Sequence, residues 1–244
     1  FDARGIDYVS DLSLANIKDL KTIVQWNNEM GIKLFRLSSQ IFPWSDEYNV
    51  EDLKDYEEIS SLMLEIGRIA TDAGQRLTMH PGPYNCLASP TQKVVDKTIR
   101  ELNSHSKQFN MFGFKPSNYN KINIHVGGAY GDRKSTLARF CNNFHLLNED
   151  TKKRLVIEND DSPNEYSVKD LFDGIYQVIG IPITFDYFHH KFNTGGLTEE
   201  EALKMASITW PEGVTQCCHY SESRRKEKLD ESIRAQAHSD LIYD

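Results

Sequence analysis

The sequence lacks the segments that direct proteins into membranes or out of the cell. No apolar run approaches the roughly 20 residues that cross a bilayer. The first residues, FDARGIDYVSD, show no basic stretch followed by an apolar one. We therefore expect an intracellular protein without a membrane partner.

Cysteine is scarce, and its spacing argues against two classes of small stabilised domain. The chain has four cysteines, and none of them forms a C-x-x-C pair. A disulfide framework and a zinc knuckle are therefore disfavoured, and a reducing compartment is expected. The four lie at Cys86, Cys141, Cys217 and Cys218.

Positive charge is also in short supply. Lys and Arg number 28 against 36 Asp and Glu, which gives a net charge of −8. This sign does not suit a protein that coats polyanions by bulk electrostatics. A nucleic-acid partner would need bound cations or a local basic groove. Arg36, Arg133, Lys134 and Arg139 are candidate phosphate contacts, with a solvated surface charge as the more common role of each.

Motifs of nucleotide-cofactor enzymes and of serine or thiol hydrolases are missing as well. Gly127, Gly128 and Gly131 form a loop that can press against phosphate, but their spacing matches no P-loop or dinucleotide fingerprint. No Ser-His-Asp arrangement stands out. These absences argue against nucleotide-cofactor chemistry and give no sign of a serine or thiol nucleophile.

The residues that are present indicate one globular α/β domain covering 1–244. The chain is 39% hydrophobic and 26% charged, as is typical of globular proteins, and it has no internal repeat. Apolar residues at helical spacing alternate with short β-rich runs. Helices are expected at about 14–27, 53–69, 89–109, 137–147, 167–180, 198–208 and 231–237.

Capping residues mark several of these helix ends. Ser89 followed by Pro90 is typical of a helix start, because the hydroxyl caps free amides and proline has none to satisfy. Ser167 is expected to cap another helix, and Thr198 begins a capping box. Gly31 is expected to end the first helix in the left-handed conformation.

Six strands separated by helical crossovers predict a parallel sheet, either in a TIM barrel or in a doubly wound fold. Five of the six strands end on a metal-capable group, which favours a barrel, because the outer strands of an open sheet would lie too far apart. The strands are expected at 32–38, 76–80, 121–126, 154–158, 183–186 and 214–219. They end on Ser38, His80, His125, Glu158, Asp186 and His219.

Histidines and carboxylates without cysteine pairs suit two or three divalent ions such as Mn²⁺ or Zn²⁺. In FDYFHH, the spacing of Asp186 and His189 allows both side chains to approach one ion, with His190 as the competing choice. His238 follows the predicted helix at 231–237 and is either a further ligand or a surface histidine.

The segment HPGPYN presents an aromatic side chain beside these ligands. The rigid turn Pro81-Gly82-Pro83 is followed by Tyr84 and Asn85. The tyrosine is either a base-stacking, lesion-probing residue or a packing residue.

At these residues the sequence resembles the UV damage endonuclease family. The matching blocks run through the chain in the family's order: FRLSSQIFPW (35–44), HPGPYNCLASP (80–90), INIHVGGAYGD (122–132), RLVIENDD (154–161), ITFDYFHH (183–190), HYSES (219–223) and AHSD (237–240).

The resemblance implies a xylose isomerase-like TIM barrel, a monomer, that binds up to three divalent ions, with Mn²⁺ expected and Zn²⁺ or Mg²⁺ as alternatives. It implies a hydrolase that nicks damaged double-stranded DNA 5′ to UV photoproducts and other lesions. Catalytic roles fall on Glu158, His125, Asp186 and His219, and substrate contacts on Pro83, Tyr84 and Asn85. The implied metal ligands are His80, His125, Glu158, Asp186, His189, His219 and His238.

Three positions depart from the family pattern. Pro83 replaces a glutamine at the first probing position. Cys217 stands where the family has a lysine that can be carboxylated to bridge metals. Glu47 stands where many members have a histidine. The family also has a first and a last strand beyond the residues found here, so we expect a barrel trimmed at both ends.

Three alternatives remain open at this stage. A sugar isomerase or epimerase uses the same ligand types on the same barrel, and an abasic-site endonuclease is a closer neighbour. A damage-binding module with a decayed metal cluster is the non-enzymatic alternative.

Overall fold

The fold was analysed in a computed structural model, which describes residues 4–243. The chain divides into two compact units. The first comprises the described residues up to Asn85, with Lys93–Asn123 and His145–Leu155. The second comprises Cys86–Gln92, Ile124–Phe144 and the described residues from Val156 onward. The organisation of 1–244 as a single domain stays a prediction.

Parallel strands form the centre of the first unit. Strand β1 (Leu34–Leu37) pairs with β2 (Arg76–Met79) in parallel along its whole length. Strand β2 pairs in turn with β3 (Ile122–Ile124), where Met79 lies opposite Ile122. The three strands confirm the parallel pairing expected from the long helical connections.

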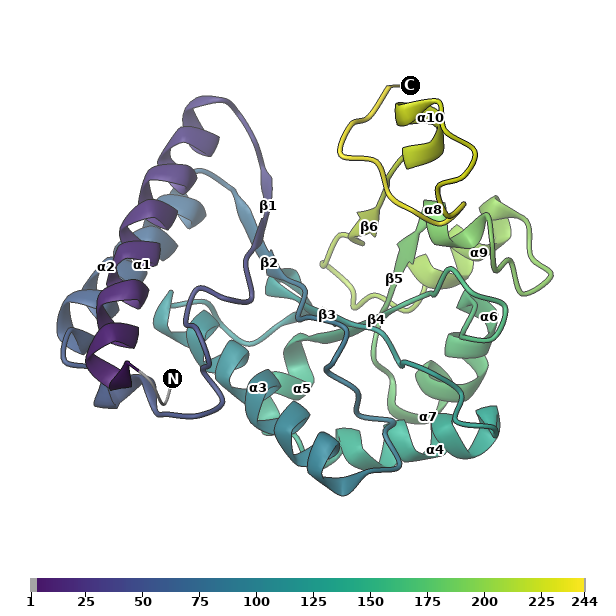
Figure 1. The fold of residues 1–244 in the computed structure, drawn as a ribbon, viewed down its shortest axis with the longest axis horizontal. Coiled ribbons are helices and arrows are strands. Elements are labelled where there is room, and N and C mark those ends of the chain that lie inside the picture. Colours follow the sequence, from purple (N-terminus) through teal and green to yellow (C-terminus); the bar gives the residue numbers. More distant parts are fainter. Residues whose placement is uncertain (1–3, 244) are drawn as a thin grey trace. The chain divides into compact units, whose positions relative to one another are not determined.

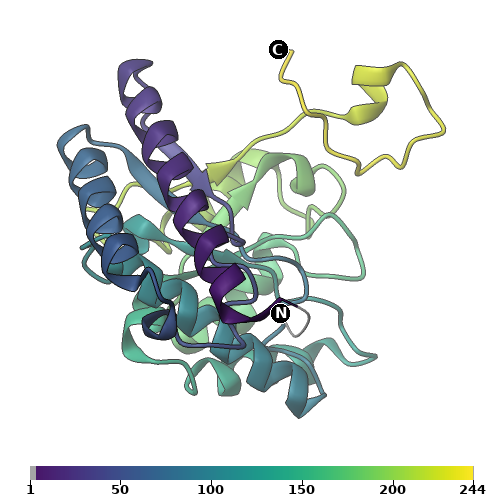
Figure 2. The same ribbon diagram turned by 60° about the vertical axis from the view of Figure 1, so that its left-hand side comes forward.

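Two long helices pack side by side in the first unit. Helices α1 (Gly5–Glu29) and α2 (Tyr56–Asp72) run next to each other in both views (Figures 1 and 2). Their apolar stripes are buried, as the 3.6-residue period predicts. After α1, Gly31 has a φ of +72°, which confirms the predicted left-handed glycine.

Shorter elements complete the first unit, and the predicted start of the third long helix is wrong by a few residues. Helix α3 (Gln92–Met111) begins after Pro90, and the Ser89 hydroxyl accepts a hydrogen bond from the Thr91 amide at 3.1 Å. A polar helix, α5 (Glu149–Arg154), was not predicted. Two 3₁₀ turns, η1 (Val50–Asp52) and η2 (Asn118–Asn120), lie in the connections.

The second unit has its own run of parallel strands. Strand β4 (Leu155–Glu158), which begins one residue before this unit, pairs with β5 (Ile183–Asp186). Strand β5 pairs with β6 (Cys218–His219), which is shorter than the predicted strand at 214–219. In this register Asp186 lies opposite His219, so two candidate ligands are brought together by the sheet itself.

Capping boxes begin two helical runs of the second unit, as predicted. One at Ser167 precedes a run that ends at Gly180, although its middle turn is π-helical. The other, at Thr198, precedes α9. The helical elements here are α4 (Arg133–Phe144), α6 (Val168–Leu171), η3 (Phe172–Tyr176), α7 (Gln177–Ile179), α8 (Tyr187–His190), α9 (Glu199–Ser207) and α10 (Arg224–Lys228).

The predicted helix at 231–237 is wrong, because this segment consists of turns. The Asp230 carboxylate accepts hydrogen bonds from the Ser232 amide and hydroxyl, and such local bonds compete with helix formation. His238 follows in an isolated antiparallel bridge with Ser223. Within residues 4–243, no helix combines the length and apolar character needed to cross a membrane.

Candidate metal centre

Three candidate ligands meet at the carboxyl ends of β4, β5 and β6. Glu158, Asp186 and His219 are the last residues of these strands. One ligand atom from each side chain lies within 4.8 Å of the corresponding atoms of the other two. Glu158 and Asp186 are only 1% and 3% exposed, so two acidic groups are held close together out of water.

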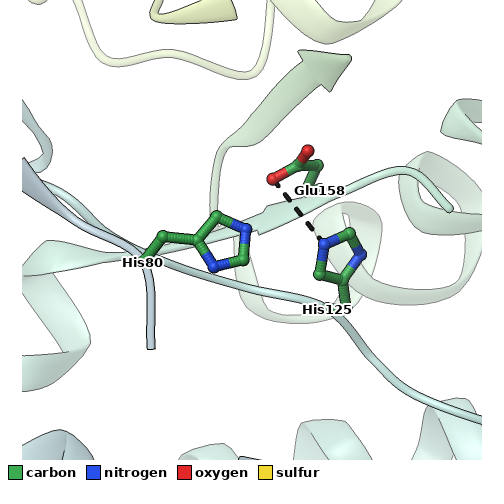
Figure 3. A group of neighbouring side chains, drawn as sticks. All are labelled: His80, His125 and Glu158. Carbon is green, nitrogen blue, oxygen red and sulfur yellow. Dashed lines mark ion pairs between the residues drawn. The ribbon is translucent and has the colours of Figure 1, made fainter. Parts of the chain in front are cut away.

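The Glu158 carboxylate lies among three imidazoles. Its Oε1 is 2.9 Å from Nδ1 of His219 and 3.6 Å from Nδ1 of His189. Its Oε2 is 3.8 Å from Nε2 of His125, and Figure 3 shows this ion pair. Glu158 is therefore the common neighbour of three histidines of the second unit, His125, His189 and His219.

His125 follows β3 and is oriented by a second carboxylate. Its Nδ1 donates to Oδ1 of Asp160 at 2.7 Å, which leaves Nε2 on the side of Glu158. Burial alone would lower the pKa of His125, but the charges of Glu158, Asp160 and Asp186 outweigh it and raise the pKa to about 9. A carboxylate behind an imidazole is the arrangement that orients metal-ligating histidines.

His189 is oriented in a similar way by the main chain. Its Nδ1 donates to the Asn159 carbonyl at 2.7 Å, and its amide donates to Oδ1 of Asp186 at 2.8 Å. Its Nε2 therefore remains as the ligating atom, 4.0 Å from Oδ2 of Asp186 and 3.1 Å from Nε2 of His238. The two ring nitrogens are close enough to ligate one cation together.

His238 reaches this cluster from the bridge near the end of the described chain. Its Nδ1 lies 2.8 Å from the Ser221 hydroxyl, and its ring packs edge-on against Phe188. His190, the competing choice, is buried against the Phe185 ring, and burial lowers its pKa. The geometry therefore favours His189 over His190.

The donor set fits a divalent ion. Burial and the neighbouring Glu158 raise the pKa of Asp186 to about 6, against the effect of His189. A cation between these carboxylates would offset the repulsion that raises this pKa. Oxygen and imidazole ligands suit Mn²⁺ or Zn²⁺, and the hydrogen bonds that the histidine rings donate to Asp160 and to the Asn159 carbonyl are the supports such ligands need.

The predicted probing segment lies in the first unit. His80 follows β2, with Nδ1 3.0 Å from the Pro81 carbonyl. Tyr84 is 90% exposed beside the exposed Pro83, whereas Asn85 is buried and donates to Glu101 and to the Gly82 carbonyl. The roles of His80 as a ligand and of these residues as DNA contacts stay predictions.

Sequence reasoning missed Asp160 and Asn159, which support the ligands. Asn159 also bridges β4 and β5: its side chain donates to the Asp186 carbonyl and accepts from the Asp186 amide. The available signal was the run ENDD, which places both residues directly after Glu158.

Comparison with known proteins supplies close relatives. A UV-damage endonuclease from Schizosaccharomyces pombe is 36% identical and matches 98% of this chain, but only 40% of that protein. One from Neurospora crassa is 35% identical over 91% of this chain and 35% of that protein. The chain thus spans less than half the length of these fungal relatives. A UV DNA damage endonuclease from Bacillus mycoides is 32% identical over 97% of this chain and 71% of that protein.

Solved structures confirm the predicted xylose isomerase-like TIM-barrel fold. SacUVDE is similar with a TM-score of 0.88 and 30% identity, and the match covers 100% of this chain and 78% of that one. A D-psicose 3-epimerase from Clostridium cellulolyticum has a TM-score of 0.59 at 15% identity, over 84% of this chain and 68% of that one. The epimerase likeness concerns the fold alone.

The family assignment completes these comparisons. The model of the family described as UV-endonuclease UvdE matches residues 2–244. Together with relatives that are more than 30% identical over nearly the whole chain, this match shows that the chain belongs to the UV-endonuclease UvdE family.

Proposed function

We propose that this chain is a metal-dependent DNA repair endonuclease that nicks damaged duplex DNA 5′ to UV photoproducts and other lesions. The reaction is hydrolysis of one phosphodiester bond. The observation that carries the proposal is the convergence of Glu158, Asp186 and His219 in a member of the UvdE family.

Six side chains of the second unit would hold the ions, and His80 is the predicted seventh. A divalent ion supplies a Lewis acid that polarises a phosphoryl oxygen and makes water a better nucleophile. Positive charge at this point also offsets the net charge of −8, which would otherwise repel the DNA backbone. The six are His125, Glu158, Asp186, His189, His219 and His238.

The protein's own contribution is to fix which atoms face the substrate. Asp160 accepts the proton on Nδ1 of His125, and the Asn159 carbonyl accepts the proton on Nδ1 of His189. Both Nε2 atoms are therefore held in ligating orientation before substrate binds, so little reorganisation is needed at the moment of reaction.

Lesion selection would rest on the exposed Tyr84. An aromatic ring that is 90% exposed can enter the base stack, where a lesion already weakens stacking. Extruding a damaged nucleotide costs less free energy than extruding a sound one. The Pro83 side chain cannot donate a hydrogen bond, so lesion selection here would depend on shape and stacking.

The test is incision of end-labelled duplex DNA, irradiated or untreated, with Mn²⁺ and with EDTA. We expect a nick 5′ to the photoproduct with Mn²⁺, leaving a 3′-hydroxyl, and no nick with EDTA or with Glu158→Gln. An abasic duplex and a ketose sugar are included as competing substrates. Nicking restricted to the abasic duplex, epimerisation of the sugar, or binding to lesions without incision would each overturn the proposal.

A further inference from the structure

Tyr130 combines an unusual backbone with an exposed aromatic ring. It lies in the glycine-rich loop between β3 and α4, has a φ of +48° and is 50% exposed. A bulky residue rarely adopts this conformation, which is strained and persists only where the surroundings impose it. Such strain is concentrated at binding and catalytic sites.

The loop around Tyr130 is held by a dense set of contacts. The Ala129 carbonyl accepts hydrogen bonds from the Thr136 hydroxyl at 2.8 Å and from the Asp132 amide at 3.0 Å. At Gly127, a Cβ would lie 2.9 Å from Sγ of Cys86, so only glycine allows this approach. The loop is thus packed directly onto the segment that follows the predicted probing turn.

The tyrosine ring is fixed at its hydroxyl end. The hydroxyl lies 3.3 Å from Sγ of Cys86, and burial of this end raises the pKa of Tyr130 to about 12. The group stays neutral at physiological pH and adds no negative charge to the surface. Arg139, which donates to the Ala88 carbonyl, places its guanidinium 5.8 Å from the ring centroid. The ring is held in one orientation while half of the residue remains open to solvent.

A lysine without an ion-pair partner lies in the first turn of the following helix. Lys134 is exposed, and no acidic group pairs with it in the described part of the chain. Its neighbour Arg133 is different: it pairs with Asp170 at 2.8 Å and covers the ring of Tyr166. Lys134 is therefore available to an external anion.

We propose that Tyr130 stacks on a base or sugar of the bound DNA and that Lys134 pairs with a neighbouring phosphate. This inference rests on the proposed function, because His125 lies five residues before Tyr130 in the same connection. A rigid aromatic ring with an adjacent free cation matches a nucleotide unit, which has a flat base and a charged phosphate.

The test measures binding to an irradiated duplex whose scissile phosphate is replaced by a non-hydrolysable linkage. Tyr130→Phe keeps the ring and loses only the hydroxyl contact, so it should bind within about twofold of wild type. Tyr130→Leu should raise Kd about 5- to 150-fold, the range measured for loss of one base–aromatic stack. Lys134→Gln should weaken binding uniformly across sequences and reduce the salt slope by about 1.

Controls separate this contact from a structural role and from the proposed function. Lys93→Gln, at an exposed lysine of the first unit, should leave the salt slope unchanged. Equal losses for Tyr130→Phe and Tyr130→Leu with lowered Tm would overturn the inference, as would wild-type affinity of Tyr130→Leu. If wild type does not nick an ordinary irradiated duplex but Tyr130→Leu still weakens binding, the proposed function fails and the DNA contact stands.

Discussion

Single residues in the second unit explain how a carboxylate can be buried at the end of a strand. Glu158 is nearly inaccessible to water, and an isolated buried carboxylate would be strongly unfavourable. Three imidazoles surround it, and two of them are held by further bonds: Nδ1 of His125 donates to Asp160 and Nδ1 of His189 donates to the Asn159 carbonyl. The cluster is preorganised by these outer hydrogen bonds, which predicts that outer residues affect activity.

Asp160→Asn tests this preorganisation. Loss of the carboxylate removes the charged acceptor on Nδ1 of His125 and lets the ring rotate, so metal affinity and nicking should each fall about 10- to 100-fold. Isothermal titration with Mn²⁺ and initial nicking rates measure the two effects. Asp161→Asn is the matched control, because the one ion pair of Asp161 among residues 4–243 is with the exposed Arg234 at 3.4 Å, and the variant should remain near wild type. Equal behaviour of the two variants would refute the role of Asp160.

The raised pKa of His125 predicts a pH-dependent stability of the metal-free protein. A pKa of about 9 in the fold, against an ordinary value of 6.5, stabilises the folded state at low pH. This contribution, on the order of 3 kcal/mol, is fully present below about pH 6.5 and is lost as the pH rises through about 9. The raised pKa of Asp186 acts in the same direction. Its contribution to stability is present at acidic pH and is already lost as the pH rises through about 6.

Thermal unfolding in EDTA between pH 6.5 and 9.5 checks this prediction. The Tm should fall across this range in wild type, and the fall should be smaller in His125→Asn. Mn²⁺ binding requires the neutral imidazole and should therefore release protons, which titration in buffers of different ionisation enthalpy detects. An identical pH slope in His125→Asn would show that another group is responsible.

Secondary-structure elements were predictable where hydrophobic spacing and capping agreed. The strand 183–186 and the capping boxes at Ser167 and Thr198 were predicted correctly, because each depends on local sequence. Helix α5 was missed because its sequence, EDTKKR, has no apolar stripe. The helix predicted at 231–237 failed because Asp230 bonds to Ser232 instead. Side-chain contacts across the sheet, such as that of His125 with Asp160, leave no periodic signal.

Helix α2 packs closely against the backbone of Phe112 at Gly67. A Cβ at Gly67 would lie 1.7 Å from the Phe112 carbonyl oxygen, so the backbone itself would have to move. Gly67→Ala should lower the free energy of unfolding by about 3 kcal/mol or more. Gly82→Ala is the control, since no heavy atom lies within 4 Å of its Cβ position. Urea denaturation measures both, and equal stability of the two variants would contradict the packing described.

At the scale of the whole molecule, the negative net charge opposes the proposed binding of DNA. A chain with a net charge of −8 is proposed to bind DNA, and it does so in this account by concentrating positive charge in bound ions and a few side chains. Composition alone argued against nucleic acid, the strand-end residues indicated divalent ions, and the family resemblance indicated damaged DNA. The family resemblance rested on sequence blocks that follow the family's order. These blocks contain the candidate metal ligands and also Asn159 and Asp160, which orient two of those ligands.

The most direct measurement is the manganese content of the purified chain. The protein is loaded with Mn²⁺, freed of unbound metal, and analysed by atomic emission beside Glu158→Gln, with circular dichroism to confirm folding. We expect at least one equivalent of manganese in wild type and a large loss in the folded variant. A wild-type chain without manganese, or a variant that keeps the full amount, would contradict this expectation.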